Sequence, residues 1–120
     1  MTIEAFRKAA LTLPGAVESA HMNHPDFRVG GRIFATLGYP DAGSGMVKLT
    51  PEQQASFIDR SPEAFEPCAG AWGRNGATSV HLAFVQQRVL LDALATAFKN
   101  VAAADQSRRK VKKQPRRSGA

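Results

Sequence analysis

The stretch HPDFRVGGRIFA, residues 24–35, decides the fold class. Two runs, 27–29 and 32–37, flank the pair Gly30-Gly31, and both are rich enough in aromatic and β-branched residues to form strands. Glycine tolerates the positive φ angles that a two-residue hairpin turn needs. The stretch therefore predicts an antiparallel β-hairpin.

The register of this hairpin has two solutions. A strict two-residue loop pairs Phe27 with Phe34, whereas a three-residue loop with a bulge pairs Phe27 with Ile33. Both faces of residues 33–35 are apolar, so the hydrophobic pattern does not choose between them. The sequence leaves both registers open.

Further strands and helices extend from the hairpin in both directions. Strand-like runs occupy 17–21, 46–49 and 77–84, the last with period-2 alternation. Helices are predicted at 2–13, capped by Thr2, at 50–60, where Thr50-Pro51-Glu52-Gln53 forms a capping box, and at 86–104; Ser61-Pro62-Glu63 predicts one more helical turn. The pattern indicates an α+β domain, with an antiparallel sheet of about five strands and N-terminal, middle and C-terminal helices packed on one face.

The charge of the chain is unevenly distributed. Its 120 residues carry 16 Lys and Arg against 10 Asp and Glu, a formal net charge of +6. Nine cations and nine acids fall in residues 1–104, whereas residues 105–120 hold seven cations and one acid. This last segment has too little apolar surface to offset the entropy lost on ordering. We therefore expect a globular domain over 1–104 and a disordered basic tail over 105–120.

The residues point neither to catalysis nor to a bound metal or other cofactor. His21, His24 and His81 lack the three or four convergent donors of a metal site. Cys68 follows Glu66, whose carboxylate raises a thiol pKa, so we expect a packing thiol rather than a nucleophile. The single cysteine and the lack of a long apolar run or signal pattern predict a cytoplasmic protein without membrane contact.

Residues 70–78, GAWGRNGAT, have the most unusual composition of the domain. They lack the Lys-Ser/Thr ending of a phosphate-binding P-loop, which weakens a nucleotide-binding interpretation. The glycines predict a tight turn, with Trp72 packed beneath the sheet and Arg74 exposed at the tip. An exposed arginine beside a rigid turn suits a phosphate or a carboxylate, so Arg74 is a candidate binding residue.

Alternation along the strands also predicts a polar sheet face. Arg28, Lys48 and His81 stand opposite the apolar residues of their own strands, so we expect them to share the face that the helices leave uncovered. A solvated surface and a binding surface both fit this pattern.

Several short motifs, taken in order, resemble the MmcQ/YjbR family. They are LPG at 13–15, HPDFRVGGRIFA at 24–35, KLTPEQ at 48–53, PEAF at 62–65 and GAWGR at 70–74. The similarity covers about residues 5–104. It implies a double-wing or CyaY-like domain, and members of the family are commonly labelled DNA-binding. Ala77 and Phe98 depart from the larger residue and the tryptophan that the family often has there, and no catalytic set is carried over.

These observations predict a small non-enzymatic nucleic-acid-binding protein, with DNA favoured over RNA and little sequence preference. The candidate contacts are Arg28, Lys48 and Arg74 in the domain and Arg108, Arg109, Lys110, Lys112, Lys113, Arg116 and Arg117 in the tail. Base stacking is not expected, because Trp72 and most phenylalanines look structural. The alternatives are a protein-interaction module that uses the open sheet face and a binding site for a small anionic ligand near Arg74.

Overall fold

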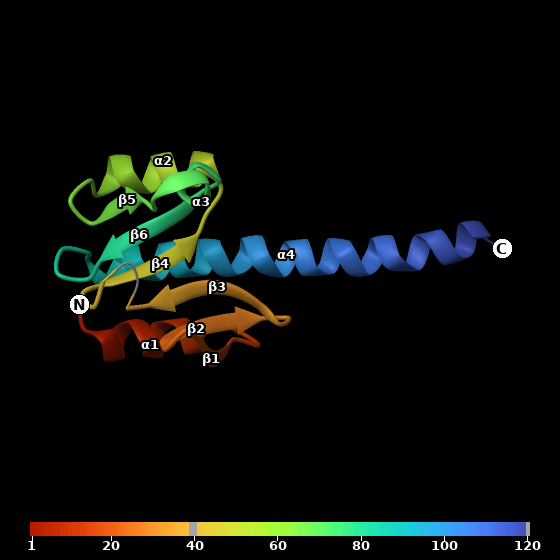
Figure 1. Cartoon of the computed structure of the whole chain (residues 1–120), viewed down its shortest axis with the longest axis horizontal. Coiled ribbons are helices and arrows are strands. Elements are labelled where there is room, and N and C mark those ends of the chain that lie inside the picture. Colours follow the sequence, from red (N-terminus) through yellow and green to blue (C-terminus); the bar gives the residue numbers. More distant parts are fainter. Residues whose placement is uncertain (39–40, 120) are drawn as a thin grey trace.

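A computed structural model describes residues 1–38 and 41–119, with side chains for 1–38 and 41–104. Four helices and six strands follow one another along the chain (Figure 1): α1 (Ile3–Leu11), β1 (Val17–His21), β2 (His24–Val29), β3 (Arg32–Leu37), β4 (Ser44–Lys48), α2 (Pro51–Arg60), β5 (Phe65–Pro67), α3 (Gly70–Arg74), β6 (Ala77–His81) and α4 (Gln87–Gly119). The predicted α+β class is confirmed. The expected disorder of the tail falls on residues whose side chains lie outside the described part of the chain.

All six strands form one antiparallel sheet, in the order β1-β2-β3-β4-β6-β5. The hairpin of residues 24–35 has the two-residue loop, with Val29 opposite Arg32 and positive φ at Gly30 and Gly31. A shift of register between Phe27 and Arg28 then places Phe27 opposite Ala35. Neither predicted partner of Phe27 is correct, because the bulge lies inside the strand pair and not in the loop.

The main core lies between one face of the sheet and the helices α1, α2 and α4, as predicted (Figure 1). Aromatic pairs join the two layers. Phe34 of β3 meets Phe98 of α4 edge-on at 5.6 Å between ring centroids, and Phe57 of α2 lies 5.4 Å from Phe65 of β5. Each such pair adds about 0.5–1.5 kcal/mol to the free energy that burial contributes.

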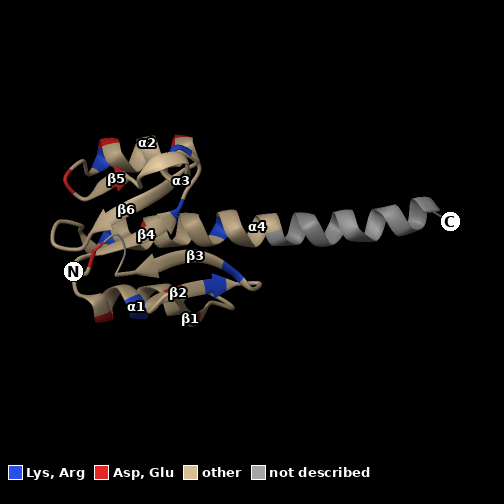
Figure 2. Ribbon diagram, in the orientation of Figure 1, with Lys and Arg blue, Asp and Glu red and all other residues tan. Residues whose placement is uncertain are grey.

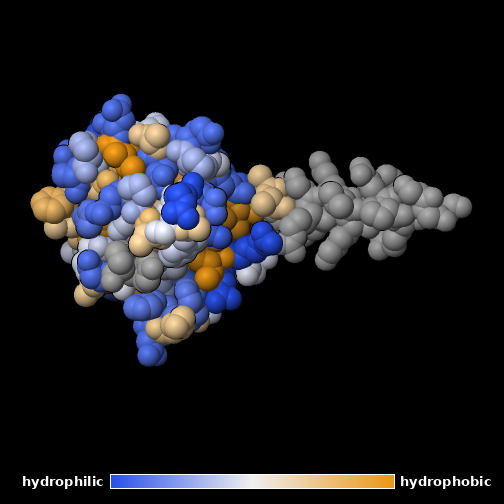
Figure 3. All heavy atoms as spheres, turned by 45° about the horizontal axis from the view of Figure 1, so that its top comes forward, coloured by the Kyte–Doolittle hydropathy of each residue, from blue (hydrophilic) through white to orange (hydrophobic). Residues whose placement is uncertain are grey.

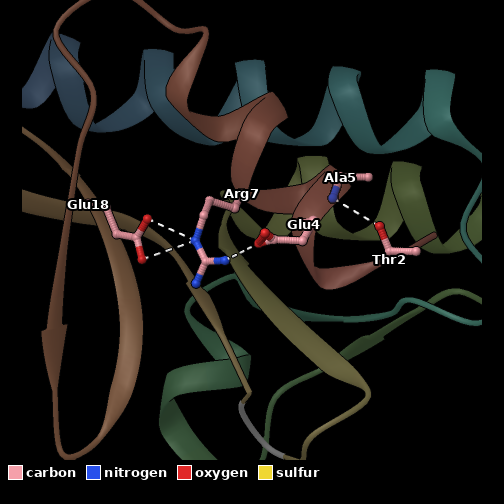
Figure 4. Close-up of polar contacts among 5 residues, drawn as sticks. All are labelled: Thr2, Glu4, Ala5, Arg7 and Glu18. Carbon is pink, nitrogen blue, oxygen red and sulfur yellow. Dashed lines mark hydrogen bonds and ion pairs between the residues drawn. The ribbon is translucent and has the colours of Figure 1, made fainter.

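Polar contacts at the N-terminus fix α1 against β1 (Figure 4). The hydroxyl of Thr2 accepts a hydrogen bond from the amide of Ala5 at 3.0 Å, which confirms the predicted cap. Arg7 pairs with Glu4 one turn earlier and donates through Nε to both carboxylate oxygens of Glu18, at 3.0 and 3.2 Å. The guanidinium thus links a helix to the outermost strand of the sheet.

Two segments differ from the predicted elements. The single helical turn predicted after Ser61 is present, because the amides of Ala64 and Phe65 both donate to the carbonyl of Ser61, but Phe65 then starts the edge strand β5, which was not predicted. The strand predicted to reach residue 84 ends at His81. The chain turns there, and the amide of Val85 donates to the carbonyl of His81. Phe84, taken as a strand residue, is instead 61 % exposed.

The second face of the sheet is only partly open, contrary to the prediction. The register places Arg28, Lys48 and His81 on that face as expected, but its centre is buried: Thr36, Met46 and Ser79 are at most 3 % exposed. Cys68 packs on Met46 and Ala77 in a small second core, which shows that the chain after β5 covers this region. The open face required by the protein-interaction alternative is therefore reduced to its margins.

Candidate nucleic-acid interface

Cationic side chains gather at one end of the sheet. Because neighbouring strands are antiparallel, the last residues of β2 and β4 lie beside the first residues of β3 and β6. Figure 2 shows the resulting blue segments of β2, β3 and α4 where the described side chains of α4 end. We call this set the cationic end; its members are Arg28, Arg32, Lys48, Arg74 and Lys99.

A hollow of about 360 Å³ lies at the cationic end. In Figure 3, hydrophilic and hydrophobic spheres meet beside the end of the described part of α4. Arg32 and Lys48 supply the charge of this cationic hollow, and none of the described lining residues is acidic. The lining residues are Arg32, Lys48, Leu49, Thr50, Trp72, Asn75, Ala77, Asn100, Val101 and Ala104. Both cations are exposed and form no ion pair with any described acid.

Hydrogen bonds between three elements hold the floor of the cationic hollow. Asn100 of α4 donates to the carbonyl of Lys48 at 3.1 Å and to Oε1 of Gln53 at 2.7 Å. The same Oε1 accepts from the amide of Thr50 at 2.9 Å, and the Thr50 hydroxyl accepts from the amide of Gln53, which completes the predicted capping box. The end of β4, the start of α2 and the middle of α4 are thereby fixed relative to one another.

Trp72 is more exposed than the predicted packing beneath the sheet implied. Residues Gly70–Arg74 form the short helix α3 instead of a simple turn. Gln54 stabilises this arrangement by donating to the carbonyls of Gly73, at 2.9 Å, and Ala77, at 3.1 Å. Trp72 is 39 % exposed and lines the cationic hollow. Base stacking was not expected because Trp72 looked structural, and that reason no longer holds.

The three domain residues predicted to contact nucleic acid differ in their availability. Lys48 and Arg74 are exposed at the cationic end. Arg28 is half-buried and donates to both carboxylate oxygens of Asp26, from Nε at 2.8 Å and from Nη2 at 3.1 Å. Its charge is therefore largely neutralised. The seven tail residues predicted as contacts have side chains outside the described part of the chain.

Asp26 gives the fold a dependence on acid. Its side chain is fully buried. The hydrogen bonds from Arg28 lower its pKa most, burial raises it, and the hydrogen bond with His21 lowers it further, so that the pKa lies below the usual 3.8. A lowered folded pKa contributes stability above the unfolded value, and this contribution is lost as the pH falls through the folded pKa. We expect the Tm to fall on acidification below about pH 4, and less steeply in Asp26→Asn. Equal slopes of Tm against pH in both proteins would contradict this assignment.

Glu66 lies close to two other titratable residues, Cys68 and His81. Burial, followed by the charge of Glu66, raises the pKa of the Cys68 thiol to about 11, which suits a packing residue. His81 lies 2.9 Å from a carboxylate oxygen of Glu66. Within residues 1–38 and 41–104, no three His, Cys, Asp or Glu side chains come close enough together to hold a metal ion.

The fold and this end of the sheet define a small α+β domain with a charged, aromatic-lined hollow. Its sequence matches the model of the YjbR family over residues 11–100, so the chain belongs to the MmcQ/YjbR family. A crystal structure of the Deinococcus radiodurans protein DR2400, with a DUF419 domain, is similar at a TM-score of 0.67 and 19 % identity, over 81 % of this chain and 75 % of that one. This likeness shows the fold alone. The chain has no match among curated proteins, and no described helix is long and apolar enough to cross a membrane.

Proposed function

We propose that this protein binds nucleic acid without catalysing a reaction, with DNA favoured over RNA and little sequence preference. The observation that carries the proposal is the cationic hollow, where Arg32 and Lys48 meet from neighbouring strands with no described acid in the wall. Burial of a phosphate there neutralises both cations and releases counterions from the nucleic acid. Such contacts fix the position of a strand but do not read its sequence.

Trp72 adds a second kind of contact to this proposal. It lies in the same wall as the two cations, and an exposed aromatic ring beside a cationic groove is typical of proteins that stack unpaired bases. Stacking contributes about 1–3 kcal/mol for each base. We therefore expect a single strand to bind more tightly than the same sequence as a duplex, by about tenfold for one stacked base.

Charge reversal within the hollow tests the proposal. In Lys48→Glu the loss of one phosphate contact and the added repulsion are expected to weaken binding of a labelled single strand about tenfold or more, measured by fluorescence anisotropy. Arg88→Glu is the matched control, because Arg88 is exposed in the first turn of α4, beyond the opposite end of β6, and changes the net charge equally. Equal weakening by both variants would show that net charge alone matters and would overturn a site at the cationic end.

A small anionic ligand is the second candidate occupant of the cationic hollow. Trp72 and Asn75, on either side of Arg74 along the chain, both line it, as the alternative near Arg74 requires. Inorganic phosphate and a mononucleotide, each added to the anisotropy assay, distinguish the candidates. Displacement of the oligonucleotide at micromolar ligand favours the small-ligand function. If the ligand displaces no more oligonucleotide than an inert salt of the same ionic strength does, the result favours nucleic acid.

A further inference from the structure

A second hollow, of about 280 Å³, lies near the turn between β1 and β2. Its described walls are His21, Met22, His24, Thr36 and Trp72. Its described lining contains neither Lys nor Arg, in contrast to the cationic hollow, and its polar side chains are two histidines, a threonine and a tryptophan. We call it the histidine hollow. Its composition suits a small molecule better than a phosphate backbone.

His21 is oriented in this hollow by a buried carboxylate. Its Nδ1 lies 2.7 Å from Oδ2 of Asp26, whose side chain is fully buried and also accepts two hydrogen bonds from Arg28. Because the Asp26 carboxylate is ionised and accepts only, Nδ1 carries the hydrogen of this bond. In the neutral ring the lone pair therefore lies on Nε2. The His21 side chain is 44 % exposed, which leaves Nε2 able to accept a proton from a ligand.

The two histidines flank the two-residue turn that joins β1 to β2. Met22 and Asn23 both have positive φ, of 50° and 66°, although neither is glycine. This turn places His21 directly opposite His24 in the register of β1 and β2. Positive φ at both central residues is what a type I′ hairpin turn requires, so the turn fixes the positions of the two histidines and is not itself a sign of a ligand.

Thr36 is a buried polar residue beside the histidine hollow. It is the Cα partner of Asp26 across β2 and β3, and it forms part of the wall of the histidine hollow. Its hydroxyl is buried and has no hydrogen-bond partner within the described residues. Because this oxygen is closed to solvent, a ligand in the hollow would not reach it, and the binding site proposed below makes no use of it.

We propose that the histidine hollow binds a small aromatic molecule that carries one acidic O–H group, with its ring against Trp72 and its oxygen at Nε2 of His21. The proton leaves the ligand oxygen as the O–H bond breaks, and a new N–H bond forms at Nε2. The ligand becomes an anion paired with the imidazolium, and Asp26 stabilises that cation from the other side of the ring. No part of this proposal depends on nucleic-acid binding.

The test uses the full chain and 4-nitrophenol, whose anionic form absorbs visible light. Trp72 is the only tryptophan and lines both hollows, so its emission reports a ligand in either one, and the variants described next distinguish the two. We expect saturable quenching of this emission, together with an increase in the anionic form of the probe at a fixed pH near its own pKa. 4-Nitroanisole has the same ring without the O–H, and we expect it to bind about tenfold more weakly or less well still.

Two variants identify the proton acceptor. In His21→Gln the increase in the anionic form is expected to disappear and affinity to fall about tenfold, whereas His24→Gln, which changes the facing residue of the same turn, is expected to keep the increase. No saturable quenching in the wild type, or an unchanged increase in His21→Gln, would overturn the proposal. Lys48→Glu is expected to leave probe binding intact, which separates this site from the cationic hollow.

Discussion

Gly73→Ala is expected to destabilise the fold by about 3 kcal/mol or more, as measured by urea unfolding. A Cβ atom at position 73 would lie 1.6 Å from the carbonyl oxygen of Cys68 and 2.6 Å from its carbon. Both contacts are to backbone, so no rotation of a side chain relieves them. The backbone of Cys68 is held in turn, because its amide donates to the carbonyl of Ala77 at 2.9 Å. To relieve the clash, α3 must move away from the backbone of Cys68, and Trp72 moves with it.

Gly43→Ala is the matched control for this prediction. A Cβ at Gly43 would meet only Oδ1 of Asp41, at 3.7 Å, which is an ordinary contact, and its φ is not positive. We expect a change within about 0.5 kcal/mol of the wild type. Similar unfolding midpoints for the two variants would show that the backbone around Cys68 yields easily, and that α3 is not held as the hydrogen bond from Gln54 to Gly73 indicates.

Elements with local signals were predictable from the sequence. The capping box at Thr50 needs only residues three apart in the chain, and it forms with both of its hydrogen bonds. The hairpin at Gly30-Gly31 forms for the same reason, since its turn depends on two φ angles. The bulge beyond this turn cannot be predicted from a local pattern. It depends on how the whole strands β2 and β3 pair, and it sets the partner of Phe27.

Elements made by distant contacts were missed. The strand β5 has only three residues and exists because Phe65 pairs with Val80 of β6, directly after the helical turn that the local signal at Ser61-Pro62 predicts. The helix α3 contains two glycines in five residues, against its intrinsic propensity. Gly73 is there because the carbonyl of Cys68 approaches too closely for any side chain.

The candidate site was predicted in part for related reasons. Exposure of Lys48 and Arg74 followed from strand parity and from the turn composition. The alternation of residues along a strand shows which face a side chain occupies but not which residue it contacts. The pairing of Arg28 with Asp26, two residues away on the same face, was therefore overlooked. Arg32 was not predicted as a contact residue, although the predicted hairpin already placed the start of its strand beside the end of the preceding strand. The exposure of Trp72 was unforeseeable without the position of α3 on the sheet.

Neutralising the tail is expected to change the salt dependence of nucleic-acid binding more than any change in the domain. Residues 105–120 carry seven cations, which contribute a slope of log K against log salt of about −6 on duplex DNA if all contact phosphates. Arg32 and Lys48 contribute about −2. Replacing all seven tail cations by Gln in the full chain should therefore reduce the slope from about −8 to about −2, measured by anisotropy across a salt series.

The residual slope decides what the domain itself does. Residues 1–104 carry nine cations and nine acids, so their net charge gives no general attraction to phosphate, and any binding that survives neutralisation of the tail must come from a local arrangement. Adding Lys48→Glu to the neutralised tail should abolish that remainder, whereas adding Arg88→Glu should not. An unchanged slope after neutralisation would exclude the tail as the phosphate contact. Loss of all binding on neutralisation alone would assign the whole interaction to the tail, and the cationic hollow would then have to be explained by another ligand.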